Sequence, residues 1–260
     1  MIIGLALWSE MEAIISDIHA NKEALEAVLH DIGNKGIDRI MCLGDIVGYG
    51  PDPKDCIDMV QQNCEFSLMG NHDWAVLNAP LGFNSVAARM VTCHKEWLEV
   101  TEQSTDRERE RWEFLSSLVM RLTYGKFDMV HASPRAELTE YIMPMDVRYD
   151  TNKLTEIFQM IESYCIVGHT HLPFCITQEF ELIVPEGTGW SLELGDRKMI
   201  INAGSVGQPR DGDNRACYII LDDGYVVYHR VPYYFDKTAE KISALGPECE
   251  VLGYRLSIGR

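Results

Sequence analysis

The stretch that decides the fold spans residues 13–45 and reads AIISDIHANKEALEAVLHDIGNKGIDRIMCLGD. Its first residues form a short apolar run that is typical of a β-strand. Leu25, Val28 and Ile32 then recur at helical spacing, and the next apolar run, at 39–43, predicts a second strand. A strand, a helix and a strand in this order predict two parallel strands that are joined by a right-handed crossover.

The same alternation continues along the chain, with a helix expected at 52–62, a strand at 65–69 and helical sequence at 86–118. Strands then predominate, and they are predicted at 119–123, 127–131, 164–167, 174–177, 180–184, 198–202, 216–221 and 225–231. Two more helices are expected, at 154–161 and, as the last element, at 236–245. These elements predict an α/β fold: a four-layer α/β/β/α sandwich of two mixed β-sheets flanked by helices.

The chain has 260 residues, 46% of them hydrophobic, which is enough for one sizeable core. Because it contains no linker-like tract and no repeat, a single domain over 1–260 is expected. Within it, residues 83–118 are predicted to form a helical insertion or lid near the functional site. Residues 1–10 begin with the apolar run 1–8, which is too short for a signal peptide or a membrane span. They are interpreted as an over-called start or a short edge strand, and are predicted to be dispensable.

The cysteines and the net charge restrict the setting and the partners. None of the eight cysteines forms a C-x-x-C pair, which favours free thiols in a reducing compartment. No stretch of the sequence could span a membrane, so a cytoplasmic protein without a membrane partner is expected. The formal net charge of −17 disfavours long nucleic acid as a partner. A small phosphate-ester substrate remains compatible with this charge if bound cations reverse it locally.

Five segments place oxygen or imidazole donors directly after an apolar strand, where open α/β sheets bind ligands. Their seven candidate metal ligands are Asp17, His19, Asp45, Asn71, His131, His169 and His171, and His72 is a spare histidine. Seven donors are too many for one tetrahedral zinc ion. They suit two first-row divalent ions that share one carboxylate and keep positions for water.

Each of these residues also has an ordinary structural interpretation. Asp17 or Asn71 alone would be a helix cap or turn residue, and His131 alone would be a core histidine. The coincidence of five such segments favours a site. By contrast, His30 and His94 are interpreted as lying on polar helix faces and His229 as alternating along a strand, so these three are assigned no role.

The order of the five blocks, D-x-H, G-D-x-x, G-N-H-D, an isolated H and G-H-x-H, resembles that of the calcineurin-like metallophosphoesterases. The resemblance covers about residues 13–230. The flanking segments 44–51 and 202–210 are similar to those of the small bacterial and archaeal phosphodiesterase-like branch. The protein-phosphatase branch has Asp-Arg-Gly where this chain has Gly48, Tyr49 and Gly50.

The resemblance implies two divalent transition-metal ions, of Mn, Fe, Zn or Ni, and in-line attack on phosphorus by a hydroxide that they share. It implies that Asp45 bridges the ions. The first ion would be held by Asp17, His19 and His171, and the second by Asn71, His131 and His169. His72 would face the leaving group as an acid or charge stabiliser, and Asp73 would orient His72.

Arg210 and Tyr49 are the predicted substrate-binding residues. Arg210 follows the Gly- and Ser-rich segment 204–207, which can bring backbone close to a ligand, and its guanidinium suits phosphate oxygens. The alternative for Arg210 is a surface ion pair with Asp211 or Asp213.

Three functions remain open on this basis. The first is a phosphodiesterase or small-molecule phosphatase, the second a phosphoprotein phosphatase, and the third a catalytically silent scaffold with the same fold. The missing arginine disfavours the second, and the retention of every candidate ligand disfavours the third.

Overall fold

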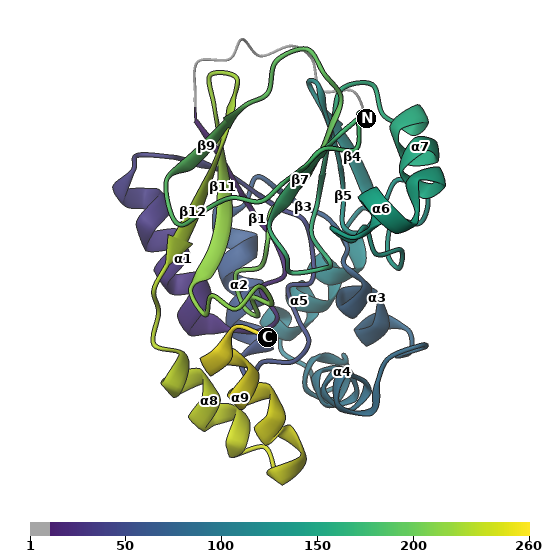
Figure 1. The fold of residues 1–260 in the computed structure, drawn as a ribbon. Coiled ribbons are helices and arrows are strands. Elements are labelled where there is room, and N and C mark those ends of the chain that lie inside the picture. Colours follow the sequence, from purple (N-terminus) through teal and green to yellow (C-terminus); the bar gives the residue numbers. More distant parts are fainter. Residues whose placement is uncertain (1–10) are drawn as a thin grey trace.

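The computed structural model describes residues 11–260, and two mixed six-stranded sheets form its centre (Figure 1). The first sheet contains, in spatial order, β3 (Phe66–Ser67), β2 (Arg39–Cys42), β1 (Glu12–Ile15), β11 (Ala216–Asp222), β12 (Tyr225–Val231) and β9 (Trp190–Glu193). The second contains β4 (Arg121–Tyr124), β5 (Phe127–Val130), β6 (Tyr164–Val167), β10 (Met199–Asn202), β7 (Phe174–Thr177) and β8 (Leu182–Ile183). The predictions for residues 1–10 fall outside the described residues.

Parallel strands form one part of each sheet. In the first sheet β1, β2 and β3 run parallel, and in the second β5, β6 and β10 do so. Helices α1 (Lys22–Asn34) and α2 (Pro53–Asn63) form the crossovers between the first three strands. This arrangement brings the carboxyl ends of neighbouring strands to one edge, where ligand sites of such sheets lie.

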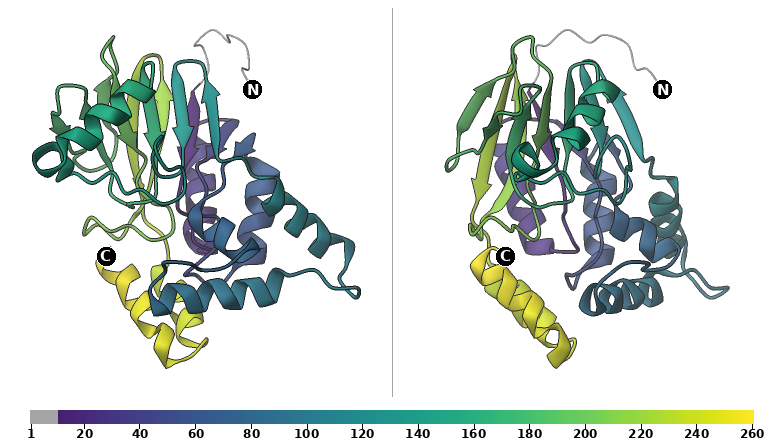
Figure 2. Two further views of the ribbon diagram at one scale, coloured as in Figure 1. Left: turned by 90° about the vertical axis from the view of Figure 1, so that its right-hand side faces the viewer. Right: turned by 45° about the vertical axis from the view of Figure 1, so that its right-hand side comes forward.

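Alternating side chains build three apolar layers. Ala13 and Ile15 of β1 pack with the helices α1, α2 and α5 (Asp106–Ser117), whereas Ile14 between them faces the second sheet. The far side of the second sheet packs on α6 (Asp146–Tyr149) and α7 (Thr151–Met160). The predicted four-layer sandwich is confirmed, and Figure 2 shows the two sheets between their helices.

The helical sequence at 86–118 forms two helices, α4 (Ser85–Leu98) and α5, where the hydrophobic pattern suggested one stretch. Thr105 starts α5 with a capping box, because its hydroxyl accepts from the Glu108 N–H while the Glu108 carboxylate accepts from the Thr105 N–H. The preceding residues 99–104 are therefore a connection. Whether the segment acts as a lid stays a prediction.

Five elements were not predicted from the sequence: the short helices α3 (Asn71–Leu77) and α6, and the three elements described next. Strand β9 extends the first sheet by pairing with β12. The helix expected to be last, at 236–245, corresponds to α8 (Phe235–Ser243), but the short 3-10 helix η1 (Pro247–Cys249) and α9 (Glu250–Ile258) follow it. An apolar cluster joins α8 and α9 to α4 and to Tyr49, which places this C-terminal pair below the ligand edge of the sheets.

All eight cysteines are free thiols, as predicted. Along residues 11–260 no helix combines the length and the apolar character that crossing a bilayer requires.

Candidate metal centre

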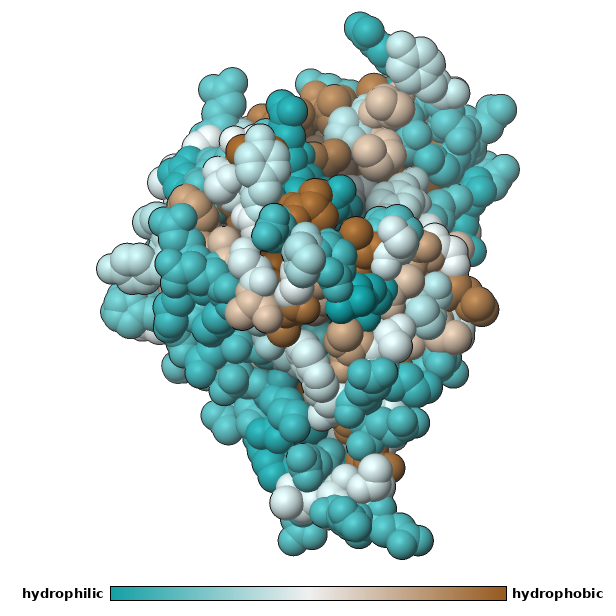
Figure 3. Space-filling view, turned by 90° about the horizontal axis from the view of Figure 1, so that it is seen from below, coloured by the Kyte–Doolittle hydropathy of each residue, from teal (hydrophilic) through white to brown (hydrophobic). Residues whose placement is uncertain are grey.

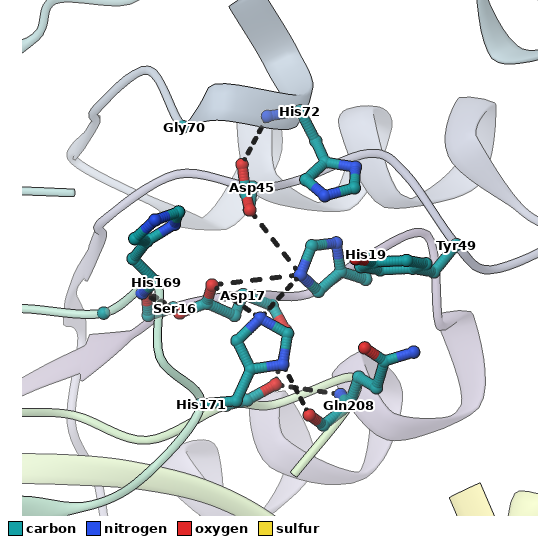
Figure 4. A network of polar contacts seen from close by, with 12 residues as sticks. Ser16, Asp17, His19, Asp45, Tyr49, Gly70, His72, His169, His171 and Gln208 are labelled. Carbon is teal, nitrogen blue, oxygen red and sulfur yellow. Dashed lines mark hydrogen bonds and ion pairs between the residues drawn. The ribbon is translucent and has the colours of Figure 1, made fainter. Parts of the chain in front are cut away.

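Two groups of carboxylate and imidazole donors meet at the ligand edge, and within each group the donor atoms lie within 4.8 Å of one another. The first group contains Asp17, His19, Asp45 and His171, and the second contains Asp45, His131 and His169. Every member is buried. Asp45 belongs to both groups, and Figure 4 shows it facing the His19 ring.

The two oxygens of the Asp17 carboxylate differ in their contacts, because only one of them accepts hydrogen bonds from the surrounding protein. Its Oδ2 accepts bonds from the Ser16 hydroxyl at 2.6 Å and the His169 N–H at 3.0 Å. Its Oδ1 is buried without a hydrogen-bond partner, while the Nε2 atoms of His171 and His19 lie 3.1 and 3.8 Å away. A buried carboxylate oxygen without a donor is costly unless a cation binds it.

The two carboxylate oxygens of Asp45 also differ in their contacts. Its Oδ1 accepts the backbone N–H of His72 at 2.8 Å. Its Oδ2 lies 3.6 Å from His19 Nε2 and 3.4 Å from His131 Nε2. Because His19 and His131 belong to different donor groups, this one oxygen stands between the two groups.

Backbone carbonyls orient three of the imidazoles. The Nδ1 atoms of His19, His131 and His171 each donate to a carbonyl oxygen, which assigns the proton to Nδ1 and leaves Nε2 for the cluster. The partners are Val47 at 3.2 Å, Leu43 at 2.9 Å and Gln208 at 2.6 Å, respectively. The Nε2 atoms of His19 and His171 are only 3.0 Å apart, and that of His169 is buried without a partner. Imidazole nitrogens in this arrangement suit metal ligation.

Five of the candidate ligands have left-handed backbone conformations, which are strained for residues with a side chain. Their φ values are 53° for Asp17, 49° for His19, 52° for Asp45, 64° for His169 and 61° for His171. The sharp turns that follow the strands impose these values. Strain of this kind is stored at functional sites.

Glycine permits the close contacts around both carboxylates. A Cβ atom on Gly168 would lie 2.1 Å from Ser16 Oγ and 2.4 Å from Asp17 Oδ2. One on Gly70 would lie 2.1 Å from Asp45 Oδ1. The glycines of the G-N-H-D and G-H-x-H blocks are therefore required by packing against the ligands.

The pKa shifts of Asp45 and His169 suit metal ligands, whereas the raised pKa of His131 keeps a second proton on its ring at neutral pH until a metal ion displaces it. Burial raises the pKa of Asp45, but His131 and His72 lower it well below the usual range. Burial lowers the pKa of His169 to about 3. Burial also acts to lower the pKa of His131, but the negative charge of Asp45 outweighs it and raises that pKa to about 9. The carboxylate is thus ionised and His169 neutral, which is the form that ligates a metal.

Asn71 and His72 are the first two residues of α3 (Asn71–Leu77). The Asn71 side-chain oxygen lies 3.2 Å from His131 Nε2, so it is available to the same site as His131. The His72 ring is 4.7 Å from the His19 ring between centroids and belongs to neither donor group. This placement is compatible with the prediction that His72 is not a ligand.

The predicted contact from Asp73 to His72 needs correction. The Asp73 carboxylate accepts from the backbone N–H groups of Val47 at 3.1 Å and Gly70 at 3.0 Å. The Nδ1 atom of His72 is buried without a hydrogen-bond partner, so it forms no bond with the Asp73 carboxylate. Asp73 therefore joins the loop after Asp45 to the start of α3.

Arg210 and Tyr49 lie together beside the cluster. An Arg210 Nη2–H donates to Gln208 Oε1 at 2.8 Å and lies 3.4 Å from the Tyr49 hydroxyl, and its guanidinium is 5.7 Å from the centre of the Tyr49 ring. Its positive charge contributes to lowering the pKa of His171, after burial. The alternative ion pairs of Arg210 are not formed within residues 11–260, because Asp211 pairs with Arg230 and Asp213 with Arg215.

Two aromatic residues at the site had not been singled out. The Tyr141 ring lies 4.0 Å from that of His169, and 47% of its surface is exposed. The Phe83 ring, at the start of the predicted insertion, lies 4.6 Å from that of His72. Tyr141 follows no motif and no regular element, so its position depends on the tertiary fold alone.

His94 is also misplaced by the sequence interpretation. It was expected on a polar helix face, but it is fully buried. It shares one side of α4 with Ala87, Val91 and Leu98, which are also buried. This helical spacing was present in the sequence and indicated the buried side.

The fold and the cluster define a two-sheet α/β protein with a candidate metal centre at its ligand edge. A sequence model of the calcineurin-like phosphoesterase superfamily domain matches residues 11–223. The chain belongs to this superfamily, as the sequence resemblance indicated.

Similar proteins occur in bacteria and archaea. An uncharacterized protein of Methanocaldococcus jannaschii is 40% identical over 260 residues, covering 96% of this chain and 98% of that protein. The crystal structure of a metallophosphoesterase from Sphaerobacter thermophilus has a TM-score of 0.79 at 38% identity, covering 96% of this chain and 99% of that one. A hypothetical protein of Pyrococcus horikoshii shares the fold with a TM-score of 0.72 at 18% identity, covering 95% and 98%.

Proposed function

We propose that this protein hydrolyses small phosphate esters, as a phosphodiesterase or small-molecule phosphatase, with two divalent metal ions. The observation that carries the proposal is the position of Asp45 Oδ2 between His19 and His131, so that one carboxylate serves both donor groups. The unpartnered Asp17 Oδ1 and His169 Nε2 add a free donor to each group.

The donors divide into two ligand sets. Asp17, His19 and His171 would hold one ion, and Asn71, His131 and His169 the other, with Asp45 shared. Bound ions would offset the negative charge of a phosphate and make water a nucleophile at neutral pH.

The residues around the ligands would bind and orient the ester. Arg210 offers a guanidinium beside the Tyr49 hydroxyl, and this pair can hold phosphate oxygens that do not react. His72, which packs between the rings of Tyr49 and Phe83, is the group proposed to face the leaving oxygen.

Seen from below, the face of the molecule is mostly hydrophilic, with apolar side chains gathered in its middle (Figure 3).

The test is turnover of a generic diester and a generic monoester by protein reconstituted with Mn²⁺, with a chelator as control. The wild type should hydrolyse at least one of them, and Asp45→Asn should lose activity by at least about 10³-fold because the shared carboxylate loses its charge. Asp55→Asn is the matched control, since Asp55 is an exposed carboxylate paired with Lys22. A metal-loaded wild type that turned over neither ester would make the silent scaffold the better account.

A further inference from the structure

His94 bonds to both glycines that flank Tyr49. Its Nδ1 accepts the N–H of Gly48 at 3.0 Å, and its Nε2 lies 2.9 Å from the carbonyl oxygen of Gly50, to which it donates. A single neutral tautomer, protonated on Nε2, satisfies both contacts. The two bonds attach α4 to the loop at 48–50.

This loop needs external support, because its backbone is strained. Tyr49 has a φ of 53°, in the left-handed region that is strained for a residue with a side chain. The loop also presses against the site, since a Cβ on Gly48 would lie 2.2 Å from His72 Nδ1 and one on Gly50 would lie 2.3 Å from the His19 carbonyl oxygen. A small shift of the loop would therefore move the groups that line the site.

The Tyr49 side chain connects this loop to the candidate substrate-binding residues. Its ring lies 4.7 Å from that of His19 and 4.6 Å from that of His72, and its hydroxyl is the atom that Arg210 approaches. The chain of contacts therefore runs from His94 through the loop backbone to Tyr49 and then to Arg210.

We propose that His94 is a positioning residue for substrate binding, which holds the loop at 48–50 so that Tyr49 and Arg210 stand at the mouth of the metal centre. This inference rests on the proposed function, because it concerns the same site. It assigns the helix α4 a role in substrate affinity although no residue of α4 belongs to either donor group.

The packing of His94 favours this role over simple filling of the core. An apolar residue would fill the space on α4 but would leave the buried Gly48 N–H and the Gly50 carbonyl oxygen without partners. A buried imidazole is instead kept with both nitrogens paired to backbone, and burial lowers its pKa to about 3, although the bond to Gly50 raises it. The ring is thus a fixed neutral bridge.

The decisive variants are His94→Leu, which retains bulk and removes both bonds, and His94→Gln, which retains an amide donor and acceptor. Loss of two hydrogen bonds of ordinary strength should raise KM by about tenfold in His94→Leu, with kcat changed less and metal content unchanged. His94→Gln should recover part of this loss. His229→Leu is the matched control, because His229 packs on Tyr218 and has no contact with the loop among its described contacts.

A double-mutant cycle separates positioning from structure. If His94 acts through Tyr49, His94→Leu should raise KM less than about twofold when Tyr49 is already alanine. Equal effects in both backgrounds, or a lower melting temperature with unchanged KM, would overturn the proposal.

Two measurements do not depend on turnover. The affinity of the metal-loaded protein for inorganic phosphate, from calorimetry, should fall by the same factor as KM rises in His94→Leu. Nitrogen NMR of histidine-labelled protein should show His94 as the neutral Nε2–H tautomer from pH 5 to 8. If the wild type hydrolysed no ester, the proposed function would fail, whereas unchanged phosphate affinity in His94→Leu would contradict the role of His94.

Discussion

At the scale of single residues, the site divides into groups that can bind metal and groups that surround them. The distinction rests on the donor groups, in which nitrogen and oxygen atoms lie within 4.8 Å of one another, because a buried nitrogen without a partner occurs in both His169 (Nε2) and His72 (Nδ1). His72 is in contact with the His19 ring, but it belongs to neither donor group. The two kinds of residue should respond differently to substitution.

His72→Ala should leave the bound metal in place and lower kcat by roughly 10²–10⁴-fold, because it removes a positioned proton donor or charge stabiliser and no ligand. Metal analysis and steady-state kinetics on the same preparation measure both effects. His30→Ala, on the exposed side of α1, is the control. Loss of metal from His72→Ala would show that His72 is a ligand.

Arg210→Ala should raise KM, or lower kcat/KM, by about tenfold or more without changing the melting temperature. The reason is that the Arg210 side chain bonds only to Gln208 and Tyr49 at the site among the described hydrogen bonds, so the fold depends little on it. Arg215→Ala, which removes a guanidinium paired with Asp213, should leave KM unchanged. Unchanged kinetics in Arg210→Ala would rule out its contact with substrate.

The candidate ligands were predictable from the sequence because each follows a strand within its own segment. Asp17 and His19, for example, need only the end of β1 to be placed. The partner of Asp73 was not predictable, since it lies in the distant loop after Asp45, whereas the burial of His94 was indicated by its helical spacing and was missed. Nothing in the sequence around Tyr141 predicted its ring contact with His169, because both residues lie in irregular segments that are distant in the chain.

At the scale of elements, α8 is fastened to α1 by a buried carboxylate. Glu23 on α1 accepts hydrogen bonds from Thr238 at 2.9 Å and Lys241 at 2.7 Å, and it pairs with Lys237 at 3.0 Å. Burial alone would raise the pKa of Glu23, but Lys241, Lys237 and Thr238 lower it from 4.5 to about 2. The helix pair below the site therefore depends on an ionised Glu23.

This link predicts a defined pH dependence. Because the folded-state pKa of Glu23 is lower than its unfolded value, its stabilisation is fully present above about pH 4.5 and is lost as pH falls towards 2. Glu23→Gln should therefore lower the free energy of unfolding by about 1–3 kcal/mol at pH 7, allowing for screening by solvent, and by progressively less below pH 4.5.

Urea unfolding of metal-free protein at pH 7, 5, 4 and 3 measures this difference. Glu26→Gln is the control, because Glu26 lies on the same helix and is exposed. A difference between wild type and Glu23→Gln that stayed constant down to pH 3 would contradict the assignment.

The helices after the sheets were harder to predict than the strands. Most of the central strands are short apolar runs that are buried at every position, so their positions can be predicted from local sequence. The α9 sequence has no apolar stripe on one side. Its buried residues Leu252 and Leu256 can be recognised only in the folded structure, where they pack in the same cluster as Tyr49. The break between α4 and α5, in contrast, could have been read from Thr105 and Glu108.

At the scale of the whole molecule, the sandwich brings buried acidic and imidazole groups together in a chain whose net charge is already −17. Without cations, the buried Asp17 carboxylate keeps one oxygen, Oδ1, without a hydrogen-bond partner, which costs stability. Metal binding should therefore stabilise the entire fold.

Saturation with Mn²⁺ at about 100 times the dissociation constant of each site should add about 2.7 kcal/mol of stability per bound ion, which corresponds to roughly 5–10 °C in melting temperature per ion. Scanning calorimetry with increasing metal, followed by chelator, measures the shift and its reversal. Asp45→Asn should show a smaller shift. A melting temperature that changed neither on addition of metal nor on addition of chelator would mean that the cluster binds no ion.

The central claim is that Asp45 joins two ion sites in one centre, and the most direct measurement is the number of metal ions bound per chain. Native mass spectrometry of Mn²⁺-reconstituted wild type and Asp45→Asn gives this number for each protein. The account predicts two ions per wild-type chain and at most one in Asp45→Asn, because both donor groups contain that carboxylate. A wild type that binds one ion at saturation, or an Asp45→Asn variant that retains two with unchanged affinity, would contradict it.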